Sequence, residues 1–197
     1  MGEGKKIVKN DLIENYSFSE AEADFFLSYH KERFVKRRQI ISHPEFIAEN
    51  RFFLVRGTFK SYVIDDSGNV KVISLAICGW DITDNSSYFQ KLPGTMFIEA
   101  LEDSIVLQVS NESEEFLKEH SHLYEKVFRM IAERNCVFME RRIISSLTKT
   151  AEERYFDFAN NYPEYLRRIP QNVIASYLGM TSQYLSRIKN KQLKKLN

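Results

Sequence analysis

Residues 169–190 read IPQNVIASYLGMTSQYLSRIKN, with Gly179 between two short amphipathic runs. If a helix-turn-helix begins at Gln171, the small residue required where its two helices touch falls on Ala175. The turn position that needs a positive φ then falls on Gly179. The apolar positions of the motif fall on Ile174, Leu178, Met180, Leu185 and Ile188. Because all seven restricted positions carry a suitable residue, the stretch predicts two helices joined by a tight turn.

The second helix of this pair has a polar outer face. Thr181 stands where an N-cap is needed, since its hydroxyl can accept a hydrogen bond from the first turn. The outward positions carry side chains that can hydrogen-bond base edges in a major groove: Ser182, Gln183, Ser186 and Arg187. The alternative is a pair of helices packed inside a core. It does not predict an outer face that has polar side chains but no acidic ones. The pattern therefore favours DNA binding.

Charge is distributed unevenly along the chain. The net charge is +1, but the segment from Tyr165 to Asn197 contains seven bases and no acid, so all 27 acidic residues precede it. The bases are Arg167, Arg168, Arg187, Lys189, Lys191, Lys194 and Lys195. A basic segment on an acidic body predicts phosphate binding, because neutralised phosphates release counterions. The alternative is a solvated, frayed chain end.

Before about residue 112, short apolar runs bounded by turn residues predict antiparallel strands. FFLVRGTFKSYVI and VKVISLAI flank the turn Asp65–Asn69 and predict a hairpin. Residues 95–110, TMFIEALEDSIVLQVS, extend the pattern with alternating apolar residues at Ile105, Leu107 and Val109. The expected fold of residues 1–120 is a jelly-roll-like β-barrel.

After Asn111 the period of the apolar residues becomes helical. Ser113 to Glu119 predicts a short helix. Apolar residues then recur at helical and heptad spacings: Leu123, Val127, Met130, Val137 and Ile144. They predict a helix of about 25 residues, assigned to 121–147, whose stripe packs on its own barrel or on a second copy of itself. The length favours a dimerisation helix.

Residues 148–197 form the third predicted domain. Thr150 and Glu153 make a capping box that starts a helix, and Pro163 ends it. A short link leads from Tyr162 to Pro170, which fits the first turn of the next helix. Few residues follow the helix-turn-helix, so its wing is expected to be small or missing.

Hydropathy and cysteine content point to a cytoplasmic protein without a membrane partner. No apolar run approaches the roughly 18 residues that span a bilayer, and MGEGKKIVKNDLIENY lacks the apolar core of a signal peptide. Cys78 and Cys136 are far apart in sequence and each has apolar neighbours. We expect two buried free thiols and no disulfide.

The last third of the chain carries a set of motif positions: Arg154, Tyr155, Pro163, Pro170, Ala175, Leu178, Gly179, Leu185, Ser186 and Arg187. Together with the order β-barrel, long helix, helix-turn-helix, they resemble the Crp/Fnr family of bacterial transcription regulators, in particular the subgroup common in Bacteroidetes. The resemblance implies an α+β protein. Its parts would be a cyclic-nucleotide-binding-like double-stranded β-helix, a dimerisation helix and a helix-turn-helix with a reduced wing.

The resemblance also implies partners. It predicts a homodimer on a palindromic operator in double-stranded DNA, with Ser182, Gln183 and Arg187 at base-reading positions. Further contacts to DNA are expected from Thr181, Ser186, Lys189, Lys191 and Arg168. The resemblance is also compatible with two additional partners, RNA polymerase and an unidentified small-molecule effector.

In the sensor half the resemblance weakens. Family members that bind cyclic AMP carry an Arg-Ser/Thr pair that holds the phosphate, and this chain has Gly94 and Thr95 there. Without the arginine nothing matches the phosphate charge, so cyclic AMP is not the expected effector. Two separated cysteines do not suffice for an iron–sulfur cluster, and no cofactor is expected. Candidate effector-pocket residues, whose aromatic members are alternatively core or dimer contacts, are Trp80, Tyr88, Phe89, Thr95 and Phe97.

Two other classes stay open as alternatives. His120, His122 and Glu125 resemble part of a cupin-like metal site, which would make the barrel an enzyme fused to a DNA-binding domain. They lie at a predicted helix start, however, and no histidine follows His122. A recombinase-type DNA-binding fragment would also use a helix-turn-helix, but it leaves the barrel unexplained. We therefore expect a regulator without catalytic or metal-binding residues.

Overall fold

The computed structural model describes residues 2–196, with side chains described up to Lys191. Lys194 and Lys195, counted above among the C-terminal bases, lie outside the described side chains. The described chain forms two compact units. The first runs up to Ser61 and includes Ala76–Asn135, and the second contains Tyr62–Leu75 and the chain from Cys136 onward. The division at residues 120 and 147 stays a prediction.

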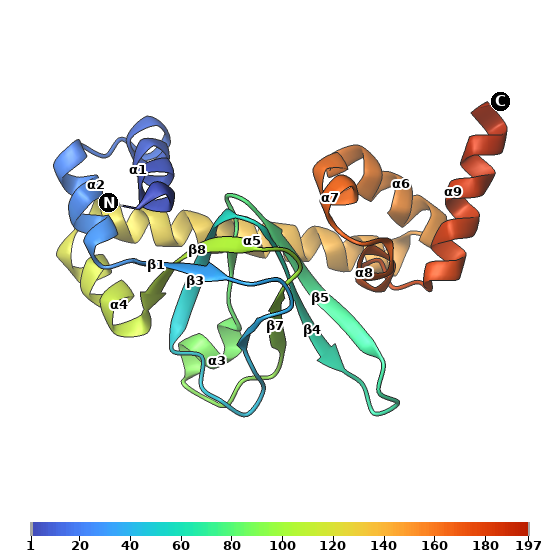
Figure 1. Cartoon of the computed structure of the whole chain (residues 1–197), viewed down its shortest axis with the longest axis horizontal. Helices are drawn as coiled ribbons and strands as arrows, with labels where there is room; N and C mark the ends of the chain where they lie inside the picture. The colour runs from blue at the N-terminus through green and yellow to red at the C-terminus, as the bar shows by residue number, and fades with distance from the viewer. Residues whose placement is uncertain (1, 197) are drawn as a thin grey trace. The chain divides into compact units, whose positions relative to one another are not determined.

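The strands are β1 (Lys31–Val35), β2 (Ile40–Ser42), β3 (Asn50–Arg56), β4 (Thr58–Ile64), β5 (Val70–Ile77), β6 (Asp81–Ile82), β7 (Phe97–Ala100) and β8 (Ser104–Ser110). The helices are α1 (Glu3–Tyr16), α2 (Glu20–Ser28), α3 (Asn85–Gln90), α4 (Asn111–His120), α5 (His122–Thr148), α6 (Ala151–Asn161), α7 (Pro163–Arg168), α8 (Gln171–Tyr177) and α9 (Ser182–Leu196) (Figure 1).

Antiparallel sheets form the barrel. Within residues 2–196, two four-stranded sheets have the strand orders β1-β8-β3-β6 and β2-β7-β4-β5. Strand β8 pairs with both β1 and β3, so that Leu107 lies opposite Glu32 on one side and Phe53 on the other. Strands that are neighbours in space but distant in sequence are typical of a jelly roll. The predicted α+β fold class, with an antiparallel barrel before a long helix, is confirmed.

Strand β8 is buried on both faces. Val106 is fully buried in the cluster inside the barrel. Leu107 and Val109 belong to a second cluster, which contains residues of α2, α4 and α5. The predicted alternation with Ile105 is therefore only partly right, because Ile105 is half-buried and Val106 also lies in a core. A central strand covered from both sides does not need a polar face.

Two helices that were not predicted, α1 and α2, precede the first strand and lie side by side (Figure 1). Helix α2 starts with a capping box, in which Ser19 accepts from the N–H of Glu22 and the Glu22 carboxylate accepts from the N–H of Ser19. Leu12 of α1 and Phe26 of α2 share a core cluster with Val127 of α5. These helices therefore cover the outer face of the barrel sheet that contains β8.

The long helix is confirmed, since α5 has 27 residues. Its apolar stripe divides into two parts. Val127 is buried in the core of the first unit, so at this position the stripe packs on the chain's own barrel and not on a second copy. Met130, Val137 and Ile144 are 39%, 44% and 52% exposed and leave an apolar row on the surface. Neither α5 nor any other helix in the described range is long and apolar enough to cross a membrane.

A buried charge network fixes the first unit internally. Arg51 of β3 is 2% exposed, and its Nε donates to Glu114 at 2.7 Å while its Nη1 donates to Asp81 at 3.1 Å. The hydroxyl of Tyr88 donates to the same Glu114 carboxylate at 2.9 Å, and Lys118 lies 2.7 Å from it. Burial opposes ionisation, but Arg51 and Lys118 hold the pKa of Glu114 below its usual value. The network joins β3, β6, α3 and α4.

Helix α6 begins with the predicted capping box, in which Thr150 and Glu153 exchange hydrogen bonds. Pro163 does not simply end a helix, because it also opens α7, which occupies most of the predicted short link. Proline is tolerated there, since the first residue of a helix has no hydrogen bond to lose. In the described chain no residue after Ser110 lies in a strand.

The cysteines are free, as predicted, but the prediction that they are buried is wrong, since both are exposed. The thiol of Cys78 donates to the Val55 carbonyl at 2.9 Å. Cys136 lies on α5, where successive residues point 100° apart, so apolar neighbours in sequence do not imply a buried position.

Candidate nucleic-acid interface

Helix α8, the turn at 178–181 and α9 form the predicted helix-turn-helix. Gly179 adopts a φ of 70°, a conformation that strains any residue with a Cβ. Its N–H donates to the Ser176 carbonyl at 3.1 Å, and the N–H of Met180 donates to the Ala175 carbonyl at 2.9 Å. These bonds close the end of α8. Ala175 itself is buried, as the motif requires.

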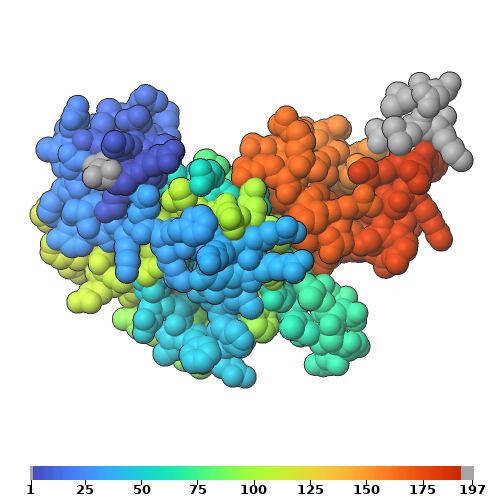
Figure 2. Space-filling model, in the orientation of Figure 1, coloured from blue at the N-terminus to red at the C-terminus, as the bar shows by residue number. Residues whose placement is uncertain are grey.

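Helix α9 begins at the predicted N-cap, because the N–H of Tyr184 donates to Thr181 Oγ1 at 3.2 Å. Leu185 and Ile188 are buried and hold α9 against its unit. The positions that do not share their side of the helix face outward: Gln183, Ser186 and Arg187 are exposed and Ser182 is half-buried. In Figure 2 the described part of α9 forms open surface at the red end of the colour scale.

Tyr184 belongs to the same surface and was missed by the sequence analysis. Its side chain is 43% exposed. Residues three and four apart share a side of a helix, so Tyr184 lies beside Arg187. An aromatic ring there can contact a thymine methyl group. The helical period of α9 places Tyr184 on the outer face. An aromatic residue in a basic helix is, however, readily interpreted as a buried core residue.

Among the predicted phosphate-contacting bases, Lys189 and Lys191 are exposed and Arg168 is half-buried, and each has a weak partner. Lys191 pairs with Glu152 at 3.3 Å and Arg168 with Glu164 at 3.4 Å. The Lys189 amino group lies 3.5 Å from the amide oxygen of Gln171. Exposed ion pairs of this kind contribute roughly 0–1 kcal/mol, so phosphates can replace these acidic partners.

Two arginines hold the C-terminal end of α8. Arg154 Nε donates to the Leu178 carbonyl at 2.9 Å. Arg142 donates to the Tyr177 carbonyl at 3.0 Å, stacks over the Tyr177 ring at 4.4 Å and also donates to the Val72 carbonyl at 3.0 Å. The last carbonyls of a helix lack partners within it, so these guanidinium groups fix where α8 ends. The sequence analysis identified Arg154 only as a motif position and did not identify Arg142.

The four aromatic effector candidates each have packing partners in the described structure, and Tyr88 and Phe89 contact each other and the same guanidinium. Tyr88 is buried in the Arg51 network, whereas Phe89 is 52% exposed with the Arg51 guanidinium 5.4 Å from its ring. Trp80 lies under the guanidinium of Arg134 at 4.4 Å. Phe97 meets the ring of His43 edge-on at 4.6 Å. These contacts favour the interpretation of the four residues as packing aromatics.

Thr95, the fifth effector candidate, binds an internal carboxylate. Asp84 is fully buried, and its Oδ2 accepts from the N–H groups of Thr95 at 2.7 Å and Met96 at 3.3 Å. Its Oδ1 accepts from the N–H of Ser87 at 3.2 Å. The backbone donors that could cradle an external anion are therefore occupied. A Cβ on Gly94 would lie 3.0 Å from a backbone carbonyl oxygen, so a larger residue does not fit without movement.

Of the residues of the cupin-like alternative, His120 packs on an aromatic ring, whereas His122 and Glu125 lie together. The His120 ring stacks on Phe25 with 4.6 Å between centroids, and His122 Nδ1 lies 3.6 Å from Glu125. In the part of the chain that the structure describes, no group of three histidine, cysteine, aspartate or glutamate side chains is placed to hold a metal ion.

Comparison with known proteins gives structural matches only. No family model matches the sequence, and no curated protein does. FixK2 from Bradyrhizobium japonicum superimposes with a TM-score of 0.71 at 19% identity, covering 84% of this chain and 85% of its own. A CooA mutant from Carboxydothermus hydrogenoformans gives 0.70 at 16% identity, covering 94% and 84%.

A further match is a protein from Eubacterium rectale assigned to the Crp/Fnr family of transcriptional regulators. Its TM-score is 0.69 at 16% identity, covering 92% of this chain and 89% of that one. The chain therefore has the fold of Crp/Fnr-type regulators, with a barrel, a long helix and a helix-turn-helix. A shared fold at this identity does not define function, which must be argued from the site.

Proposed function

We propose that the chain is a transcription regulator of the Crp/Fnr type that binds specific DNA sequences through α9. One observation carries the proposal: the exposed side chains of Gln183, Ser186 and Arg187 project from a helix held by the Gly179 turn. No acid occurs anywhere in α9. Such a helix matches the hydrogen-bonding edges of base pairs in a major groove without repelling the phosphates.

Within this interface the residues have different roles. Arg187 is exposed, and no hydrogen bond or ion pair joins it to another described residue, so its guanidinium is available for the O6 and N7 atoms of guanine. Gln183 and Ser186 contact neighbouring bases. Lys189, Lys191 and Arg168 exchange their weak partners for phosphates and set the orientation on the duplex. Thr181 caps the first turn of α9, and Ser182 is a further base-reading position.

The functional form is a homodimer. Met130, Val137 and Ile144 lie seven residues apart on α5, and all three are exposed. A heptad row of apolar side chains on a helix is buried when two copies pack along it. Two recognition helices would then read half-sites about 34 Å apart on a palindromic operator.

Cyclic AMP is not the effector on this proposal. The motivating observation is that Asp84 already occupies the backbone donors of Thr95 and Met96. A phosphate there would meet a buried carboxylate and no arginine, and it would lose its hydration without replacement. On this proposal the protein acts in the cytoplasm and catalyses no reaction. Its further partners are RNA polymerase and an unidentified small molecule.

The proposal is tested by selecting bound sequences from a pool of random duplex DNA with the full chain. We expect enrichment of a palindrome whose half-sites are about 10 base pairs apart, centre to centre. Arg187→Glu is the control, because it reverses the charge at an exposed position and leaves the buried positions of α9 intact. Recovery of no preferred sequence by the unmodified chain, or equal enrichment by the control, would contradict the proposal.

A further inference from the structure

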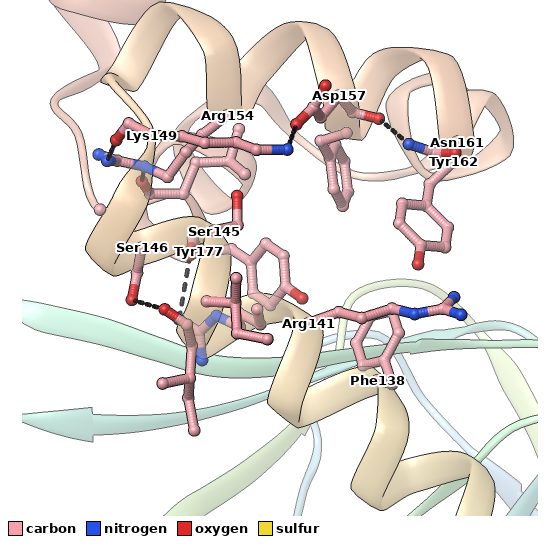
Figure 3. A pocket seen from close by; sticks show the side chains of 16 residues that line it. Phe138, Arg141, Ser145, Ser146, Lys149, Arg154, Asp157, Asn161, Tyr162 and Tyr177 are labelled. Atoms are coloured by element: carbon pink, nitrogen blue, oxygen red, sulfur yellow. Dashed lines mark hydrogen bonds and ion pairs between the residues drawn. The ribbon is translucent and has the colours of Figure 1, made fainter.

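A cavity of about 800 Å³ lies within the second unit, lined by α5, α6 and the end of α8 (Figure 3). Its volume is in the range of sites for small organic ligands. Four aromatic rings form much of its wall: Phe138, Phe158, Tyr162 and Tyr177. Tyr162 lies 5.6 Å from Phe138 and 5.5 Å from Phe158, centroid to centroid, so the rings form a continuous apolar surface.

The lining also carries positive charge, from Arg141, Arg142, Lys149 and Arg154 against the acid Asp157. Lys149 is paired with Asp157, while Arg142 and Arg154 donate to backbone carbonyls. Arg141 is exposed and has no interaction with another described residue. The cavity therefore favours an anion, and Arg141 is the cation available to meet it.

Two phenolic hydroxyls face the same space. Neither Tyr162 nor Tyr177 uses its hydroxyl in a hydrogen bond with another described residue, and Figure 3 shows Tyr162 pointing toward Arg141. Burial raises the pKa of Tyr177 to about 12, so this hydroxyl stays protonated near neutral pH. Both hydroxyls can then donate to an acceptor on a ligand.

We propose that this cavity binds a small aromatic carboxylate, with its ring against Phe138, Phe158 and Tyr162 and its carboxylate at Arg141. The planar guanidinium matches a carboxylate with two parallel hydrogen bonds. The aromatic walls add ring contacts that an aliphatic acid does not make. A cationic ligand is disfavoured, because the lining carries an excess of positive charge.

Binding would bear on the recognition helix, because Leu178 and Gly179 of the turn before α9 also line the cavity. A ligand that packs against this turn shifts α9 only if it binds one orientation better than another. This regulatory consequence rests on the proposed DNA-binding function, whereas ligand binding itself does not.

The experiment is calorimetric titration of the full chain, without DNA, with millimolar phenylacetate and indole-3-acetate. We expect saturable binding of at least one acid. Phenylacetamide, which lacks the charge, and acetate, which lacks the ring, should bind at least about tenfold more weakly. Because DNA is absent, failure of ligand binding and failure of the DNA-binding proposal are distinguishable.

Two variants test the site itself. Arg141→Gln should weaken binding of the aromatic acid at least about tenfold, whereas Arg129→Gln should not change it. Arg129 is the matched control, since it lies on α5 in ion pairs with Glu125 and Glu133 and does not line the cavity. Tyr177→Phe keeps the ring and should weaken binding with little change in melting temperature. No saturable heat with either acid, or unchanged binding by Arg141→Gln, would overturn the proposal.

Discussion

The hydroxyl of Ser176 accepts a hydrogen bond from the backbone N–H of Val72 at 3.1 Å. The same hydroxyl donates to the Val70 carbonyl at 2.9 Å, and Arg142 donates to the carbonyl of Val72. One short segment of β5 is thus bonded to side chains from α8 and α5. The position of α8, and with it the start of α9, depends on these bonds.

Removing this contact should destabilise the second unit. Ser176→Ala is expected to lower the free energy of unfolding by about 1 kcal/mol, and Arg142→Lys by about 2 kcal/mol, because an ammonium group cannot reach the same carbonyls as a guanidinium. Urea unfolding measures both. Ser186→Ala, at an exposed position of α9, should stay within about 0.5 kcal/mol of the unmodified chain. Equal effects of the two serine variants would show that the Ser176 bonds contribute nothing.

Arg187→Ala should reduce affinity for a selected operator much more than affinity for random DNA. A bidentate contact to guanine accounts for roughly 1–3 kcal/mol of discrimination. Lys189→Ala is the comparison, and it should weaken binding to all sequences alike and reduce the salt slope by about 1. Fluorescence anisotropy with both DNAs at several salt concentrations separates the two patterns. If Arg187→Ala gave the pattern expected of Lys189→Ala, Arg187 would contact phosphate only.

If the chain dimerises along α5 as proposed, Val137→Glu should leave a monomer with intact secondary structure. The substitution places a charge in the middle of the apolar row on α5, and an unpaired buried charge opposes association strongly. Sedimentation and circular dichroism give the two readouts. Ile7→Glu is matched in exposure, at 50% against 44%, and should leave the dimer intact. A dimeric Val137→Glu variant would move the interface to another surface.

Cyclic AMP and cyclic GMP should not bind. The Asp84 carboxylate fills the donor positions beside Thr95, and calorimetry at millimolar nucleotide should therefore show no saturable heat. Operator affinity should also be unchanged by either nucleotide. Micromolar binding that is lost on substitution of Thr95 would contradict this prediction.

His30 should make the first unit sensitive to acid. It is 2% exposed, its ring nitrogen Nδ1 lies 2.9 Å from the Phe26 carbonyl, and burial lowers its pKa from 6.5 to about 4. As pH falls, the unfolded chain binds this proton before the folded chain does. The contribution of neutral His30 to the free energy of unfolding is therefore fully present above the pKa of the unfolded state. It is lost as pH falls through the pKa of the folded state, by about 3 kcal/mol in total.

Urea unfolding between pH 7 and pH 4 measures this loss. His30→Phe cannot titrate, so its stability should depend less on pH over this range. His43→Phe, at an exposed position, is the control and should keep the full dependence. An unaltered pH dependence in His30→Phe would assign the acid sensitivity to other groups.

The helix-turn-helix could be predicted because its constraints are local. A positive φ at Gly179 and a small residue at Ala175 are set by backbone geometry within a few residues. The capping box at Thr150 is local in the same way. Helix α2 has an equally local signal in Ser19 and Glu22, which was overlooked.

Features that depend on distant parts of the chain were not predicted. The exposure of Cys136 and the burial of Val127 depend on which side of α5 meets the core, and a period of 3.6 residues alone does not define that side. The partners of Arg51 come from residues 30 and 63 positions away. Arg142 likewise bonds to a strand 70 positions before it. No local pattern records such pairings.

Strand β5 lies at the margin of its sheet, where backbone groups without a neighbouring strand invite pairing with another chain. Ser176 and Arg142 occupy these groups at Val70 and Val72. The side chains that hold α8 are therefore also expected to oppose pairing of this edge with another chain. Variants that loosen α8 are expected to form intermolecular β-structure on storage, even where they retain affinity for DNA.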